Sequence, residues 1–110
     1  MNIIVTEAKP GVRCISLKGR LDAPGVQAIE ESFQAEVAAI PNLIVDMTWV
    51  PLISSIGVRL LVAAAQTQKK MGGKMVIVNP DNACRRVLKT TGIDQVVPVF
   101  ERMEEATGAF

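Results

Sequence analysis

The chain has 110 residues, of which 49% are hydrophobic and 4% aromatic, and its formal net charge is +1. This length fits a single domain, 1–110, whose core at about 2–100 is built mainly from aliphatic side chains. Nearly balanced charge is unlike the footprint of a nucleic-acid-binding protein, so we expect no direct contact with nucleic acid. The longest apolar run, 60–65, is far too short to cross a bilayer, so we expect no membrane insertion.

The composition also argues against catalysis. The chain has no histidine, which removes the Ser-His-Asp and Cys-His routes to an activated nucleophile and the commonest metal ligand. Cys14 and Cys84 lack metal-type spacing and are interpreted as reduced packing residues. The N-terminus shows no basic segment followed by a sustained apolar stretch. We therefore expect a cytoplasmic protein that is no enzyme and that holds no metal and no cofactor.

The first part of the chain predicts a hairpin followed by a helix. Two short apolar stretches, 2–7 and 12–18, flank a Lys-Pro-Gly turn signal and predict an antiparallel pair of strands. Asp22 then fits the N-cap of a helix that runs to about Ala39. Apolar residues at spacings of three and four give this helix one buried face: Val26, Ile29, Phe33, Val37 and Ile40.

The remaining sequence alternates strands with helices. The pattern predicts strands at 43–47, 74–78 and 96–100. It also predicts a helix at 55–71, a second helix that is capped by Asp81 and ends at Gly92, and a frayed helix at about 102–107. Strands that alternate with helices imply parallel pairing and right-handed crossovers. The sequence therefore predicts a compact α/β domain with a helix or tail at 101–110.

Two serines, Ser54 and Ser55, open the helix predicted at 55–71. Free backbone N–H groups and the helix dipole favour negative charge at such a position, so a phosphate on Ser55 would suit the fold. From the motif alone, the plainer interpretation is a helix cap, and the two roles are compatible. Helical spacing gives one exposed stripe, Ser55, Arg59, Val62 and Gln66, and one buried stripe, Val58, Leu61 and Ala65.

Five blocks of sequence occur in one order and register: GRLDA (19–23), LIVD (43–46), ISSIGVRLL (53–61), GGKMVIVNP (72–80) and VLKTTGID (87–94). Together they resemble the STAS domain, the fold of bacterial anti-sigma-factor antagonists. The resemblance covers nearly the whole chain. It implies a mixed sheet of four to five strands, wound with its helices into a right-handed βα superhelix.

The resemblance also implies a function. Antagonists of this family bind an anti-sigma factor that is itself a serine kinase, which frees the sigma factor. The kinase phosphorylates a serine at the start of the helix after the third strand, and a metal-dependent serine phosphatase reverses the reaction. When Gly57 is aligned with the glycine of the family motif, the resemblance implies that Ser55 is the phosphate acceptor. Ser54 then replaces the aspartate that is typical of the motif, and it becomes a competing acceptor.

We expect the partner to contact one surface around these serines: Asp22, Ser54, Ser55, Gly57, Arg59, Val62 and Gln66. Gly57 would let the partner approach the helix backbone. Asp22 is either an N-cap or part of this surface. Asp46 most simply bonds loop amides. Trp49 is either core cover or an exposed anchor, and we expect packing.

Two other functions stay open. The replacement of the motif's aspartate by Ser54 is compatible with a STAS module that is not phosphorylated, such as a stress-signalling scaffold or a transporter-associated subunit. An enzyme that uses Ser55 as a nucleophile is disfavoured because the chain lacks histidine. The chain is expected to be a monomer or a weak dimer.

Overall fold

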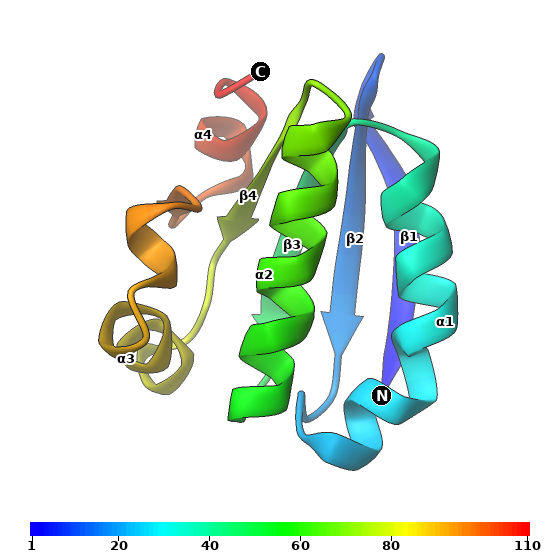
Figure 1. Ribbon diagram of the computed structural model, residues 1–110. Helices are drawn as coiled ribbons and strands as arrows, with labels where there is room; N and C mark the ends of the chain where they lie inside the picture. Colours follow the sequence, from blue (N-terminus) through cyan, green and yellow to red (C-terminus); the bar gives the residue numbers. More distant parts are fainter.

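In the computed structural model, residues 1–110 form a five-stranded sheet in the order β1-β2-β3-β4-β5, with helices packed against it (Figure 1). The strands are β1 (Asn2–Lys9), β2 (Val12–Lys18), β3 (Asn42–Trp49), β4 (Lys74–Val78) and β5 (Val99–Phe100). β1 pairs antiparallel with β2, and every other neighbouring pair is parallel. The predicted hairpin and the predicted parallel pairing are both confirmed.

The helices are α1 (Ala23–Ala39), α2 (Ser55–Lys70), α3 (Asn82–Thr90) and α4 (Met103–Thr107), with a 3₁₀ turn, η1 (Ile93–Gln95), after α3. Both predicted aspartate caps are present. Asp22 Oδ1 accepts the Gly25 N–H at 3.0 Å, and Asp81 Oδ1 accepts the Cys84 N–H at 2.8 Å. Each bond satisfies an amide that the helix leaves free in its first turn.

The strand predicted at 96–100 is wrong in its first half. The chain turns at Gly92, whose φ is +78°, and the Val97 N–H donates to the Ile93 carbonyl at 2.8 Å. This amide therefore belongs to the η1 turn and not to the sheet. Val96 is 76% exposed, and pairing with β4 begins only at Val99.

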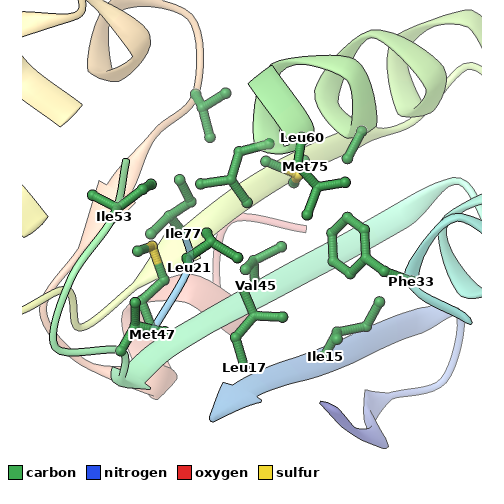
Figure 2. Packing of buried hydrophobic residues seen from close by; sticks show 14 of the residues in the cluster. Ile15, Leu17, Leu21, Phe33, Val45, Met47, Ile53, Leu60, Met75 and Ile77 are labelled. Atoms are coloured by element: carbon green, nitrogen blue, oxygen red, sulfur yellow. The ribbon is translucent and has the colours of Figure 1, made fainter. Parts of the chain in front are cut away.

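The main core lies between the sheet and the two long helices (Figure 2). Most of its 21 buried residues come from one face of the sheet and from the apolar faces of α1 and α2, and the rest come from α3, η1 and the connecting segments. Phe33 of α1 and Leu60 of α2 pack over Val45 and its neighbours, as Figure 2 shows. The helical periodicity of α1 predicts most of its buried face, since Val26, Ile29, Phe33 and Val37 are buried, whereas Ile40 is the C-cap residue and is half-buried.

A smaller cluster occupies the opposite face of the sheet. Val12, Cys14, Ile44, Val76 and Val78 are covered there by Ala106 of α4, which is fully buried. The terminal segment is also tied back by Lys9, whose Nζ donates to the carbonyl oxygen of Phe110 at 2.7 Å. The end of the chain is therefore docked, whereas the sequence predicts a frayed helix. None of the helices combines the length and the apolar character needed to span a bilayer.

Candidate functional site

The predicted site residues lie along the edge of the sheet where its parallel strands end. The connection from β2 to α1 and the connection from β3 to α2 run side by side at this edge, and Leu21 and Ile53 form a parallel bridge between them. The first turns of α1 and α2 therefore begin close together, as the lower edge of Figure 1 shows. Ligands of open α/β sheets bind at this kind of edge.

The carbonyl of Leu21 joins the two connections. It accepts the backbone N–H of Ser54 at 3.0 Å and the hydroxyl of Ser54 at 3.2 Å. The Leu21 N–H in turn donates to the Leu52 carbonyl at 2.8 Å. No local sequence pattern indicates the role of Leu21, because its partners lie more than thirty residues away. Three bonds therefore fix the loop before α2 against the loop before α1.

The role predicted for Gly57 is wrong. Gly57 is buried, and a Cβ built at this position would lie 2.6 Å from the Leu21 carbonyl oxygen and 2.8 Å from Leu21 Cγ. The backbone that closely approaches Gly57 belongs to this chain and not to a partner. Glycine is required here because no side chain fits between α2 and Leu21.

The two serines have different environments. Ser54 is the N-cap residue of α2 and half-buried, but its hydroxyl donates to Leu21 and caps no amide of the helix. Ser55 is the first helical residue, its side chain is exposed, and its hydroxyl forms no hydrogen bond. The plain interpretation of the pair as a side-chain cap is therefore wrong. The first-turn amides of α2 have no side-chain acceptor, in contrast to those of α1 and α3.

The exposed stripe of α2 is largely as predicted. Ser55, Arg59 and Gln66 are exposed and Val62 is half-buried, so these four side chains share the outer surface of the helix. The buried stripe of α2 differs from the prediction by one position. It consists of Gly57, Leu60, Leu61, Ala64 and Gln68, while Val58 and Ala65 pack at its margin.

Both oxygens of Asp22 have partners within the chain. Oδ1 caps α1 through Gly25, and Oδ2 lies 3.2 Å from Nε of Arg20. The cap role is therefore confirmed. The side chain of Asp22 is 25% exposed, and a contact with a partner stays a prediction.

Asp46 holds a polar network on the face of the sheet opposite α1 and α2. Its carboxylate accepts the Thr48 N–H at 3.0 Å, the Thr48 hydroxyl, and the Ser16 hydroxyl at 3.2 Å. Asn79 extends the network by donating to Thr48 Oγ1 at 3.1 Å from a left-handed backbone with φ of +54°. The structural role predicted for Asp46 is confirmed. Ser16, Thr48 and Asn79 were missed because three separate strands bring them together.

The prediction that Trp49 packs against the core is wrong. Its side chain is 60% exposed at the end of β3, and the Lys18 ammonium lies 5.7 Å from the centroid of its ring. Leu52, three residues further along in the loop that leads to α2, is 39% exposed. The buried positions of this loop are Val50 and Ile53. The sequence contains apolar residues at all four positions, so composition alone does not separate the inner from the outer ones.

The two thiols are protonated at neutral pH. Burial, followed by the hydrogen bond and charge of Asp81, raises the pKa of Cys84 from 9.0 to about 12. Burial, and then the charge of Asp46, raises the pKa of Cys14 as well. Since the thiolate is the reactive form, neither cysteine is an activated nucleophile.

The chain belongs to the STAS domain family, whose model matches residues 4–106. It is 29% identical over 99 residues to the anti-sigma-F factor antagonist RsfB of Mycobacterium tuberculosis, across 87% of this chain and 79% of RsfB. Among solved structures, an anti-sigma factor antagonist from Mycobacterium paratuberculosis superimposes with a TM-score of 0.87 at 28% identity, over 98% of this chain and 92% of that chain.

The fold is also similar to a STAS domain attached to a transporter. The SulP transporter STAS domain from Vibrio cholerae matches with a TM-score of 0.70 at 26% identity, over 89% of this chain and 77% of that chain. The resemblance seen in the sequence and the predicted mixed-sheet fold are thereby confirmed.

Proposed function

We propose that this protein is an anti-sigma-factor antagonist. It binds an anti-sigma factor with serine-kinase activity through the α2 surface, releases a sigma factor, and is switched off when Ser55 is phosphorylated. A metal-dependent serine phosphatase restores the active form. The observation that carries the proposal is the likeness, over most of both chains, to RsfB and to the Mycobacterium paratuberculosis antagonist.

The environments of the serines support Ser55 as the acceptor. A kinase needs a free hydroxyl, and that of Ser55 is exposed and unbonded. The hydroxyl of Ser54 is half-buried and donates to the Leu21 carbonyl, so its phosphorylation would break a bond that fixes the loop. Ser54 therefore suits a structural role although it replaces the aspartate typical of the family.

A phosphate on Ser55 would act on the partner more than on the fold. It adds about −1.5 to −2 charges beside free amides at a helix N-terminus, where negative charge is favourable by about 0.3–1 kcal/mol. A partner surface shaped for a neutral hydroxyl would instead have to desolvate a dianion. A penalty of about 4 kcal/mol weakens binding by a factor of about 10³.

The test begins with capture from a lysate of the source organism. Tagged wild type is compared with Ser55→Ala, Ser55→Asp and, as a matched control, Ser32→Asp on the exposed surface of α1. We expect wild type, Ser55→Ala and Ser32→Asp to retain an anti-sigma serine kinase, and Ser55→Asp to lose it. Mass spectrometry after incubation with that kinase and ATP should place the phosphate on Ser55.

The transporter STAS domain supports a second candidate, an interaction module without a phosphorylation switch. In that case wild type and Ser55→Asp capture the same transporter or scaffold protein with equal recovery, and no kinase is retained. That result would refute the antagonist proposal.

A further inference from the structure

The last residue of β3 and the loop that leads to α2 present apolar side chains outward. Trp49 and Leu52 are 60% and 39% exposed, whereas Val50 and Ile53 are 1% and 6% exposed. Ser54 follows directly. The outward pair, together with Lys18 beside the Trp49 ring, is called the Trp49 surface below.

Backbone hydrogen bonds hold this segment at Trp49, Val50 and Leu52. The Trp49 carbonyl accepts the Gly19 N–H at 3.0 Å, and the Leu52 carbonyl accepts the Leu21 N–H at 2.8 Å. The Val50 N–H donates to the Met47 carbonyl at 3.1 Å. The loop therefore does not need to reorganise in order to present the indole, which lowers the entropy cost of binding through it.

Burial inside the chain does not explain the position of Trp49. An indole left largely in water contributes little to folding through its area, because the hydrophobic gain scales with the apolar surface removed from water. The same side chain is strongly enriched among the residues that dominate the energy of protein interfaces. A single exposed apolar residue would carry no weight, but Trp49 at the end of β3 and Leu52 in the following loop lie on one short segment that leads into the proposed switch serine.

Unpaired charge at the Trp49 ring and on the first turns of α2 indicates the chemistry of the partner. Lys18 and Arg59 are exposed and form no ion pair, whereas Arg20 is paired with Asp22. Arg59 lies one helical turn from Ser55. A partner that faces two unpaired cations is favoured if its own surface is acidic. Phosphate on Ser55 would offset these cations and repel the same acidic surface.

We propose that the Trp49 surface anchors the anti-sigma factor: the indole enters an apolar pocket of the partner, and carboxylates at the rim of that pocket face Lys18 and Arg59. This inference rests on the proposed antagonist function. It assigns the largest contribution to the binding free energy to the segment before Ser55. The indole supplies affinity independent of phosphorylation, and the charges make the same contact sensitive to phosphate.

The chain has one tryptophan, so this residue can report on its own environment. Protein labelled with 5-fluorotryptophan gives a single ¹⁹F resonance from Trp49. The probe is the anti-sigma factor recovered in the Ser55 experiment, purified without label. We expect the resonance to shift when the partner is added, and solvent accessibility measured by acrylamide quenching of the free protein to be high.

Affinities of variants provide the second measurement. Trp49→Ala should weaken binding by about 30-fold or more. The control Ile4→Ala removes a side chain that is 44% exposed on the edge strand β1, and it should leave affinity unchanged. Lys18→Glu should slow association, with a smaller effect at high salt. Its control is Lys89→Glu at the end of α3, which makes the same charge change away from this surface.

The outcomes separate this inference from the proposed function. If wild type binds the anti-sigma factor and Ser55→Asp does not, but the resonance is unmoved and Trp49→Ala binds like wild type, the inference is overturned and the antagonist function stands. If no anti-sigma factor binds wild type, the function is overturned and the inference with it. Circular dichroism of Trp49→Ala should match wild type, and the label experiment needs no variant at all.

Discussion

Replacing Gly57 with alanine sets two effects of known size against each other. In an open helix interior, alanine is more favourable than glycine by about 1 kcal/mol. Here the new Cβ would lie 2.6 Å from the Leu21 carbonyl oxygen and 2.8 Å from Leu21 Cγ. Forcing a methyl group into a packed interior costs about 1–3 kcal/mol. Because the shorter contact is to backbone, we take the upper part of that range.

The net effect of Gly57→Ala is therefore a loss of about 2 kcal/mol, which lowers the melting temperature by roughly 8 °C. Urea unfolding followed by circular dichroism measures it. Ala63→Gly, at an exposed position of the same helix, calibrates the propensity effect and should cost about 1 kcal/mol. If Gly57→Ala is as stable as wild type or more stable, the contact with Leu21 does not constrain α2 and the reasoning fails.

Three further predictions concern the cap, the thiols and the terminal helix. Asp22→Ala should lower the free energy of unfolding by about 1 kcal/mol because α1 loses its cap. Asp22→Asn should lower it little, since it keeps the cap and loses only the ion pair with Arg20. Urea unfolding of both variants tests this. The pKa of Cys84 is about 12 in the folded protein against an ordinary 9.0. The protonated thiol therefore stabilises the fold fully below pH 9.0, and this stabilisation is lost as the pH rises to about 12. The difference in unfolding free energy between wild type and Cys84→Ala should therefore shrink between about pH 7 and about pH 10.5, and a constant difference would contradict the assigned shift. Ending the chain after Phe100 removes the cover over Val12, Ile44 and Val76. The truncation should lower the free energy of unfolding by about 2–3 kcal/mol and increase binding of an apolar dye. Unchanged dye binding would show that α4 is dispensable.

The sequence predicts those features of this fold that depend on neighbouring residues. The buried face of α1 follows from the spacing of Val26, Ile29 and Phe33, and the caps at Asp22 and Asp81 follow from residue type and position. The exposed stripe from Ser55 to Gln66 follows from helical geometry in the same way. These features need no knowledge of the rest of the chain.

The features that the sequence does not predict depend on residues far apart in the chain. Gly57 is constrained by Leu21, which precedes it by more than thirty residues and meets it only across two parallel strands. Trp49 is exposed because β3 ends at the rim of the sheet, which no local pattern reveals. Ala106 is buried because the terminal helix crosses to the second face of the sheet.

The Leu21 carbonyl accepts both the backbone N–H and the hydroxyl of Ser54, and these two bonds affect the rate at which a partner can bind. A loop tied at its backbone to a neighbouring connection presents the same shape before and after an encounter, so a docking partner does not wait for it to order. Association is then limited by diffusion, orientation and electrostatic attraction, so a modification that changes the charge at this edge would alter both how often the two proteins meet and how long they stay together.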